Sequence, residues 1–547
     1  MQNLSKWWKS GSPWIWLNAG AVAVSMVTVI ALLMLILVRG LGHFWAADIV
    51  ELVYQDQNGP QKIIGELVRK EMVDLKKLGV EVSEFRDGER WLIKTGNREL
   101  SADFRWIEHA GIVSVSRPKD LVVLERNEWG SFYGYLNSVS EQGELVKKGD
   151  EAWAEFSQRV ERVALLREKI HQLERFEMGS VNYQLEQLRL KRRRLELDGN
   201  DTPAALEKIL LDESRFGKEF DSFMADLMAL NKEIERDSAT FQVMDGQQKT
   251  ILLAQIIKGL RPNSMSTFQK VKQYVATFVG FLSDNPREAN TEGGVFPAIF
   301  GTVVMVLVMS IIVTPFGVVA AVYLREYASQ GIVTKVVRIA VNNLAGVPSI
   351  VYGVFGLGFF VYFLGGSLDS LFFPEYAPAP YLGTSGMMWA SLTLALLTLP
   401  VVIVSTEEGL TRIPRNLREG SLALGATKAE TLWKVVLPMA SPSIMTGLIL
   451  AVARAAGEVA PLMLVGVVKL APELPLDGNF PYLHMERKFM HLGFHIYDVG
   501  FQSPNVEAAQ PLVYATAFLL VLIIVILNLS AILLRNNLRE KYRGIAG

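Results

Sequence analysis

An arginine and a glutamate, Arg454 and Glu458, lie four residues apart in an otherwise uncharged apolar stretch, residues 443 to 467. A charge in a membrane-length segment costs about 2.5 to 3.5 kcal/mol on insertion scales, so a function is the default explanation for its presence. The spacing places both side chains on one helical face, where they can neutralise each other. Because a planar guanidinium binds oxyanions through two hydrogen bonds, we predict a substrate path at this pair.

Two readings of the pair stay open. It could be a purely structural ion pair, or Glu458 could accept a hydrogen bond from a protonated oxyanion and release Arg454 when substrate arrives. One arginine does not compensate an oxyanion alone. Further donors are therefore expected from a partner subunit and from Ser349, Thr302 and Asn343 on this chain.

Other chemistry finds little support in the sequence. The chain has no cysteine, which excludes disulfides, thiolate metal sites and cysteine nucleophiles. Gly217-Lys218 does not complete a phosphate-binding loop, since Asp212 stands where its first glycine belongs and Glu219 replaces Ser or Thr. His484, His491 and His495 have no metal-ligand spacing. We therefore expect no enzyme activity and no cofactor on this chain, and the net charge of -1 indicates no nucleic-acid partner.

The elements that position the pair belong to a membrane protein. The 547 residues carry 3 charges in residues 1 to 40, 78 in 41 to 294 and 30 in 295 to 547, so a water-soluble block interrupts apolar sequence. Residues 17 to 38 form an uncharged run of 22, long enough to span a bilayer. We interpret this run as an uncleaved anchor, with a cleaved signal as the alternative. Five further spans are predicted at 296 to 323, 341 to 364, 387 to 405, 443 to 467 and 511 to 534.

The distribution of Lys and Arg predicts the orientation. Basic residues gather after the first, third and fifth of these later spans, whereas the loop 365 to 386 has none. The positive-inside rule then places both termini in the cytoplasm, with residues 1–39 and 535–547 at the two ends. The block 40–295 lies on the far side of the membrane.

The block 40–295 changes pattern along its length. Residues 47 to 137 alternate as short strands, with a turn at Gly96-Asn97. Residues 150 to 236 have a helical period instead, with a turn around Asn200 and Pro203 in the first turn of the second helix. We predict an antiparallel coiled-coil hairpin inserted in a β domain. The run Lys191-Arg192-Arg193-Arg194 is predicted to be a solvated face, with binding to an acidic partner as the alternative.

The loop 407–438 carries a motif. After Leu417 it places Glu419, the small residues Gly420 and Ser421, then Gly425, and after nine further residues Val435-x-Leu437-Pro438. This pattern resembles the EAA loop of ABC importer permeases, which in that family forms two short helices at a glycine turn and sits in a groove of the ATPase subunit. Gly420 and Ser421 stand where the motif has alanines, so small size is kept while helix propensity falls.

Further stretches narrow the resemblance. NNLAGVPSIVYGVFGLG (342 to 358), ARAAGEVAPL (453 to 462) and FQSPNVEAAQPLVYATAFLLV (501 to 521) are similar to the PstA-type phosphate permeases, over about residues 285 to 545. Val459 departs from the threonine expected in that family. The resemblance implies a type I, MetI-like fold of six transmembrane helices, with a permease core at 296–534 in the bacterial inner membrane.

The resemblance also implies a function and partners. We expect a permease subunit of an ATP-driven phosphate importer that works by alternating access in the lipid bilayer. A PstC-like permease, a PstB-like ATPase dimer that holds ATP and Mg, and a PstS-like periplasmic phosphate-binding protein would complete the importer. Two alternatives remain: a permease for sulfate or molybdate, and an envelope adaptor or signalling scaffold acting through the block 40–295.

Overall fold

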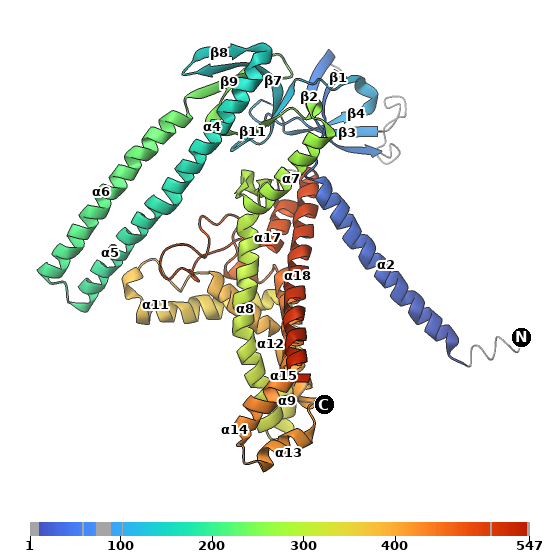
Figure 1. Cartoon of the computed structure of the whole chain (residues 1–547), viewed down its shortest axis with the longest axis vertical. Coiled ribbons are helices and arrows are strands. Elements are labelled where there is room, and N and C mark those ends of the chain that lie inside the picture. Colours follow the sequence, from blue (N-terminus) through green and yellow to red (C-terminus); the bar gives the residue numbers. More distant parts are fainter. Residues whose placement is uncertain (1–9, 57–58, 73–88, 101, 504–505, 544–547) are drawn as a thin grey trace, which may run out of the picture.

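The computed structural model describes residues 10–56, 59–72, 89–100, 102–503 and 506–543. Figure 1 shows a β domain at one end, a long helical hairpin that descends from it, and a bundle of apolar helices. The predicted cytoplasmic N-terminus with the first transmembrane helix, residues 1–39, is described from residue 10, and the predicted cytoplasmic tail, residues 535–547, as far as residue 543.

The first apolar run folds as α2, Ser12–Gly42, which is longer at both ends than the predicted span. Its apolar side chains are largely exposed, and Figure 1 shows the helix diverging from the bundle toward the N-terminus. Its other end packs tightly on α18, Val506–Arg543, since a Cβ on Gly40 would lie 2.8 Å from the carbonyl oxygen of Tyr514. Exposed apolar surface along a helix of this length suits a lipid environment.

Two antiparallel sheets form the β domain. One has the order β4-β3-β2-β1-β5 and the other β10-β9-β7-β6-β11, with β8 on β7. The predicted turn at Gly96 and Asn97 has φ of 54° and 53°, the left-handed conformation that a tight turn uses. Ile49 and Ile64 of the first sheet pack with Leu121 and Tyr133 of the second, which joins the sheets. The strands are β1 Ile49–Asp56, β2 Gly59–Met72, β3 Glu89–Lys94, β4 Phe104–Glu108, β5 Ile112–Ser116, β6 Leu121–Arg126, β7 Phe132–Glu141, β8 Glu144–Lys148, β9 Asp237–Gln242, β10 Gln248–Leu252 and β11 Ile256–Leu260.

The helical hairpin consists of α4 Ala152–Gln172, the π-helical turn η3 Leu173–Met178, α5 Gly179–Asp198 and α6 Pro203–Ile234. Phe156 and Val163 of α4 are buried against the second sheet, which anchors the hairpin to the β domain. The chain stays helical through Gly179, where the sequence pattern suggests an interruption of the seam. The extra residue of a π turn rotates the apolar stripe without ending the helix. Gly199, at φ 67°, ends α5, and Pro203 begins α6.

The bundle begins after α7 Thr267–Ser283 and the short strands β12 Pro286–Arg287 and β13 Glu292–Gly293. The central helix α12 lies between α8 and α15, and most of its N-terminal half is buried. The bundle helices are α8 Phe296–Val322, α9 Ile332–Leu344, α10 Ser349–Phe355, α11 Gly366–Phe372, α12 Met387–Thr411, α13 Arg415–Ala423, α14 Lys428–Thr431, α15 Leu437–Gly457, α16 Leu462–Val465, α17 Leu492–Tyr497 and α18. The π-helical turns η7 Tyr323–Tyr327, η8 Gly356–Gly365, η10 Leu432–Val436 and η11 Asp498–Gln502 continue the helices α8, α10, α14 and α17.

Within the described residues, six helical stretches are long and apolar enough to cross a membrane. They are Pro13–Gly42, Phe296–Tyr327, Ser349–Phe372, Met387–Thr411, Lys428–Gly457 and Ala509–Glu540. This is the six-helix arrangement expected from the sequence, with the β domain and the hairpin inserted after the first helix.

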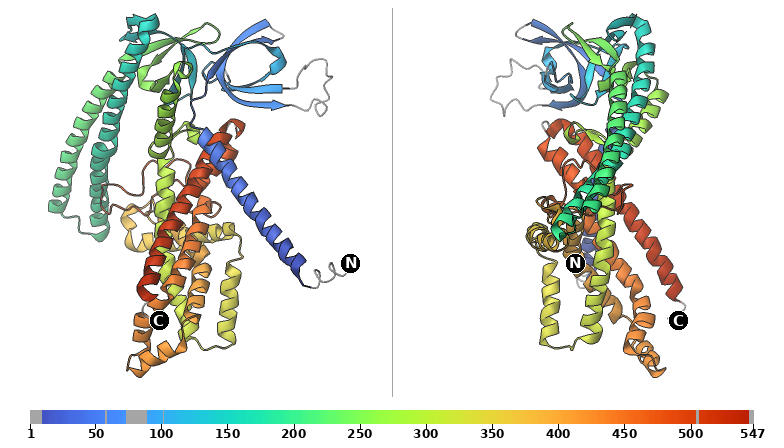
Figure 2. Two further views of the ribbon diagram at one scale, coloured as in Figure 1. Left: turned by 45° about the vertical axis from the view of Figure 1, so that its right-hand side comes forward. Right: turned by 90° about the vertical axis from the view of Figure 1, so that its left-hand side faces the viewer.

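Two predicted span boundaries are wrong. The stretch 341–364 combines the end of α9 with α10, because the chain leaves the helix at Ala345 and Pro348 disfavours a helical residue before it. Figures 1 and 2 show the stretch from α10 to α11 running across the bundle, while α9 runs along it. The stretch 443–467 is not one helix either, because α15 ends at Gly457.

Candidate functional site

Arg454 lies in the last turn of α15 and Glu458 follows the end of that helix. Glu458 has φ −79° and ψ 134°, so its backbone is extended. The prediction that both side chains share one helical face is therefore wrong, although the two still meet. Nε of Arg454 lies 3.6 Å from Oε1 of Glu458, with the side chains 35% and 20% exposed. A cation in the last turn is also favoured by the partial negative charge of the helix C-terminus.

The short helix α10 packs beside this pair. A Cβ on Gly353 would lie 2.7 Å from Cα of Pro461, three residues after Glu458, and one on Gly356 would lie 2.3 Å from the hydroxyl of Thr393. Tyr352 is buried, donates to the carbonyl oxygen of Leu344 at 2.6 Å, and lies within electrostatic reach of Arg454. Gly353 allows α10 to approach the backbone that follows α15, and Gly356, at the start of η8, allows the continuing helix to approach α12.

The additional donors predicted from the sequence are placed differently. The hydroxyl of Thr302 donates to the carbonyl oxygen of Ala298 at 2.7 Å and accepts from the backbone N–H of Leu492 at 3.0 Å, so its hydrogen bonds are used within the protein. Ser349 lies in the first turn of α10, one turn before Gly353, and Asn343 is exposed near the end of α9. Val459 packs on Gly493 of α17, where an added Cβ would lie 2.8 Å from its methyl carbon.

The loop with the EAA-like motif folds as two short helices, α13 and α14, joined at Gly425. Gly425 has φ +88°, a conformation that L side chains rarely adopt. Thr427 caps α14 in a capping box with Glu430. The hydroxyls of Ser421 and Thr431 lie 2.9 Å apart and hold the two helices together. The motif therefore forms a compact helical corner at the end of the bundle opposite the β domain (Figure 1).

Several contacts seat this corner on the bundle. Arg418 donates to Glu326 at 3.0 Å and to the carbonyl oxygens of Leu410 at 2.7 Å and Ile413 at 2.9 Å. An apolar cluster of Leu410, Ile413, Leu432, Val436 and Ala440 lies beneath it.

The outer side of the corner stays open. Glu419 and Gly420 are exposed, and a Cβ on Gly420 would meet nothing within 4 Å. Leu424 is 91% and Trp433 73% exposed. Leu437 and Pro438, at the other end of the motif, are partly buried in the first turn of α15. Apolar side chains this exposed at a well-formed corner indicate a partner surface.

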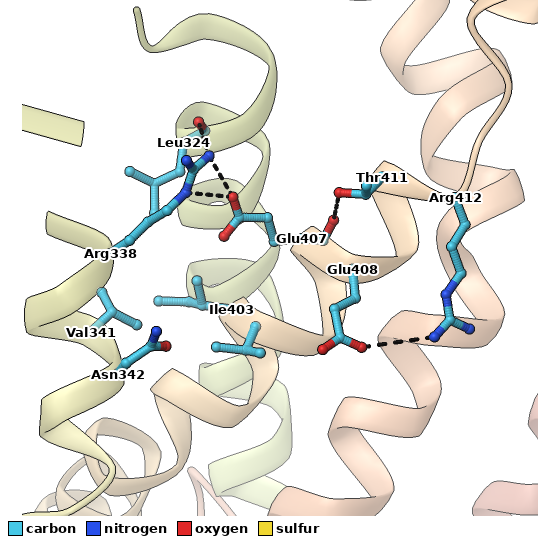
Figure 3. A pocket seen from close by; sticks show the side chains of 10 residues that line it. Leu324, Arg338, Val341, Asn342, Ile403, Glu407, Glu408, Thr411 and Arg412 are labelled. Atoms are coloured by element: carbon cyan, nitrogen blue, oxygen red, sulfur yellow. Dashed lines mark hydrogen bonds and ion pairs between the residues drawn. The ribbon is translucent and has the colours of Figure 1, made fainter. Parts of the chain in front are cut away.

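A pocket beside the corner was not predicted from the sequence. It has a volume of about 510 Å³ and lies between α9 and the end of α12 (Figure 3). Arg338 of α9 forms an ion pair with Glu407 of α12 at 2.6 Å and also donates to Gln330 at 2.9 Å. The sequence prediction placed Glu407 in the loop because the apolar residues stop before it. In the structure α12 continues to Thr411. The sequence did contain a signal for this pair: Arg338 and Glu407 have opposite charges and stand next to neighbouring apolar stretches.

The part of the chain that the structure describes contains no group of three or more His, Asp or Glu side chains that could hold a metal ion. His484 lies between two carboxylates, with Nε2 2.9 Å from Asp477 and Nδ1 3.2 Å from Glu486. His491 and His495 are buried, and burial lowers the pKa of His491 to about 3 and that of His495 to about 4.

Comparison with known proteins places the bundle in a family. Residues 313–544 match the family described as "Binding-protein-dependent transport system inner membrane component". The phosphate transport system permease protein PstA of Mycobacterium leprae is 41% identical over 192 residues, 35% of this chain and 57% of that protein. PstA 1 of Mycobacterium tuberculosis H37Rv is 35% identical over 247 residues, 44% of this chain and 70% of that protein. The probable ABC transporter permease protein YqgH of Bacillus subtilis is 34% identical over 202 residues, 37% of this chain and 61% of that protein.

The chain thus spans less than two thirds of two of these relatives. Among solved structures, an inward-facing MetNI methionine ABC transporter matches with 20% identity and a TM-score of 0.33, over 44% of this chain and 94% of the transporter chain. The family assignment accordingly rests on the sequence relatives and the family model. The chain belongs to the binding-protein-dependent transport system inner membrane components and, within them, to the PstA-like permeases of MetI-like fold.

Proposed function

We propose that the protein is the transmembrane permease subunit of an ATP-driven importer of inorganic phosphate. The observation that carries this proposal is the Arg454–Glu458 pair, partly exposed at the end of α15, with α10 packed on Pro461 three residues beyond it. A guanidinium offers a phosphate two parallel hydrogen bonds and a full charge. The likeness to relatives named as phosphate permeases adds support.

The pair and the corner lie at two ends of one helical stretch, Lys428–Gly457, and this suggests how transport is driven. At 1.5 Å per residue such a stretch is about 45 Å long. An ATPase that moves α13 and α14 would therefore move Arg454 with them. Glu458, beyond the helix end, would exchange its ion pair with Arg454 for a hydrogen bond to a protonated phosphate.

The orientation and the partners complete the proposal. The Lys and Arg distribution supports cytoplasmic termini and a corner that faces the cytoplasm, with the β domain and the hairpin on the far side. The exposed Glu419, Gly420, Leu424 and Trp433 would contact a PstB-like ATPase dimer, which holds the ATP and Mg. A PstC-like permease would supply further phosphate donors, and a PstS-like protein would deliver the substrate.

Uptake with competing anions tests the substrate. The complete importer in proteoliposomes is expected to accumulate labelled phosphate on ATP addition, with no loss at a hundredfold excess of sulfate or molybdate. Equal competition by sulfate would assign the path to another oxyanion. Phosphate binding that needs no Arg454 would remove the proposed site while leaving the family assignment untouched.

A second candidate, an envelope adaptor or signalling scaffold, is favoured by one observation, the length of the hairpin. Its helix α6 alone has 32 residues. Deletion of residues 150–236 separates the two functions. Retained uptake with lost docking of another envelope protein would support the scaffold, whereas lost uptake would tie the hairpin to transport.

A further inference from the structure

The hairpin returns to the bundle of its own chain. Tyr183 of α5 donates a hydrogen bond to the carbonyl oxygen of Phe480, and its ring lies 6.4 Å from that of His484. Arg194 lies 3.6 Å from Glu375, whose side chain is only 7% exposed. Tyr183 and Arg194 are eleven residues apart, about three helical turns, so they share one face of α5. The charge run Lys191–Arg194 is largely exposed, as predicted, and only its last residue, Arg194, lies near an acidic group of the bundle.

The two loops under α5 form one connected surface, defined here as the outer platform, residues 373–382 and 473–487. The rings of Tyr376 and Tyr381 lie 4.7 Å apart. Burial and the nearby carboxylate of Glu486, in the other loop, raise the pKa of Tyr381. Arg487 is held by Asp477 at 2.7 Å and Glu473 at 2.9 Å. Both loops lie against α5, one through Glu375 and the other through Phe480.

The outer platform is also joined to the central helix and to the candidate site. The backbone N–H groups of Met387 and Met388, at the start of α12, donate to the carbonyl oxygens of Arg487 at 3.0 Å and Met485 at 2.8 Å. The chain between Glu458 and the platform includes Gly466, where an added Cβ would lie 2.6 Å from the carbonyl oxygen of Gly386. The outer platform is therefore in direct backbone contact with the start of α12.

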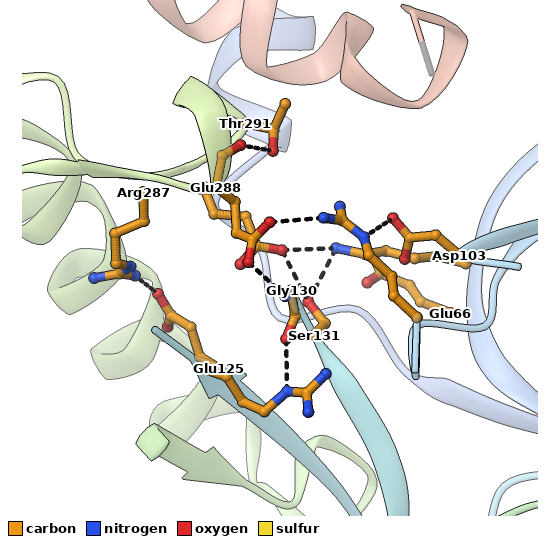
Figure 4. Close-up of polar contacts among 12 residues, drawn as sticks. Glu66, Asp103, Glu125, Gly130, Ser131, Arg287, Glu288 and Thr291 are labelled. Atoms are coloured by element: carbon orange, nitrogen blue, oxygen red, sulfur yellow. Dashed lines mark hydrogen bonds and ion pairs between the residues drawn. The ribbon is translucent and has the colours of Figure 1, made fainter. Parts of the chain in front are cut away.

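The β domain, which carries the hairpin, is itself fixed to the bundle by residues 288–290. Glu288, Ala289 and Asn290 follow one another with φ of 44°, 53° and 72°, three left-handed residues without a glycine. Such strain persists only where the surroundings hold it. Glu288 accepts from Arg98 at 2.8 Å and from the N–H of Gly130 at 3.1 Å, both in the β domain (Figure 4). Asn290 donates to the buried Asp498 at 3.0 Å, in the bundle.

We propose that the hairpin is an intramolecular brace that holds the outer platform in its present arrangement. The β domain, fixed at Glu288 and Asn290, holds the hairpin in place. Helix α5, the arm of the brace, contacts the platform through Tyr183 and Arg194. Rearrangement of the platform during a transport cycle then requires the arm to release. The consequence for transport rests on the proposed function, whereas the docking of the arm does not.

Because the chain has no cysteine, two introduced cysteines can carry spin labels without background. Asn200 at the hairpin tip and Lys488 beside the platform are exposed and suit this purpose. We expect one narrow distance between the labels in the full chain in nanodiscs. The variant Tyr183→Phe/Arg194→Glu removes the hydroxyl and sets two carboxylates against each other, which should shift the ratio of docked to released hairpin by about fivefold to thirtyfold.

The matched control is Arg193→Glu, which reverses the same charge one residue away, where the ion-pair partner is Glu196 of α5 itself. It should leave the distance unchanged. An unchanged distance in the double variant would overturn the docking. Equal broadening in both variants would also overturn it, because a general effect of charge on the hairpin would then explain the result.

A locked hairpin tests the effect on transport. Cysteines at Arg194 and Glu375, joined by a short cleavable thiol crosslinker, should lower uptake at least tenfold, with recovery after cleavage. Full uptake with complete crosslinking would refute the brace. Should the wild-type importer take up another anion instead of phosphate, the label distances still decide the docking and the lock is tested with that anion.

Discussion

Neutralising Arg454 alone and together with Glu458 decides what the pair at the end of α15 does. Arg454→Gln is expected to stop uptake, and the double variant Arg454→Gln/Glu458→Gln is expected not to restore it. The ion pair has a separation of 3.6 Å and partly exposed partners. A pair of this kind contributes about 0.5 to 1 kcal/mol, which corresponds to a factor of about two to five.

Binding of phosphate would involve larger energies. Two hydrogen bonds from a guanidinium to an anion contribute at least about 3 kcal/mol, so their loss lowers uptake by about a hundredfold or more. A purely structural pair behaves differently, because removing both charges relieves the uncompensated carboxylate and returns function. Arg454→Lys, which keeps the charge without the planar fork, should give an intermediate rate.

The assay is the initial rate of labelled phosphate uptake at low substrate concentration in proteoliposomes that contain the complete importer. ATP hydrolysis and thermal stability of each variant control for assembly and folding. Recovery of the double variant to within fivefold of wild type would refute the reasoning and leave a structural ion pair. A hundredfold loss in both single and double variants supports the substrate path.

Three further predictions concern packing, backbone strain and pH. Gly353→Val should lower the free energy of unfolding by about 1 to 3 kcal/mol, because its Cβ would meet the backbone of Pro461 at 2.7 Å. The control Gly358→Ala, whose Cβ meets nothing within 4 Å, should be neutral, and equal losses would contradict the close approach. Gly425→Val should cost about 1 to 2 kcal/mol at φ +88° and reduce ATPase binding at least fivefold, whereas Gly420→Ala, in open space within α13, should keep the corner folded; a pull-down with the ATPase measures both. Burial lowers the pKa of His491 to about 3 and that of His495 to about 4, below the value of 6.5 in the unfolded chain. As the pH falls below 6.5 the unfolded chain therefore binds more protons than the folded one, and stability is lost down to the folded pKa values. Acidification from pH 7 to 5 should cost about 2 kcal/mol for each histidine, and a His491→Gln/His495→Gln variant that denatures with unchanged pH dependence would disprove this.

Local chemistry explains why parts of the fold could be read from the sequence. Uncharged apolar runs leave few alternatives to membrane helices, and Gly96, Gly199, Pro203 and Gly425 mark turns because their backbone preferences are strong. The two-helix form of the EAA-like loop was implied by its resemblance to the family motif. Each of these features depends on a few neighbouring residues.

The misread boundaries depend on residues that lie far apart in sequence. Apolar composition did not reveal that α9 and α10 are separate helices with different directions, since residues 341–364 carry no charge. α15 ends at Gly457, and Pro461, four residues later, packs against Gly353, more than a hundred residues earlier. Hydropathy averages over such breaks, and only packing decides them.

The sequence by itself determined the class of the protein, the soluble block after the first span, the corner at 407–438 and the identity of the charged pair. The soluble block and the charged pair follow from composition and from the cost of a charge in an apolar segment, whereas the class and the corner follow from the resemblance to the EAA-loop permeases. The tertiary structure alone decided that Glu458 lies beyond the helix, that Arg338 pairs with Glu407, and that the hairpin returns to Phe480 and Glu375. These pairs join residues up to 297 positions apart, and nothing in a linear pattern specifies which distant charge or carbonyl a side chain will meet.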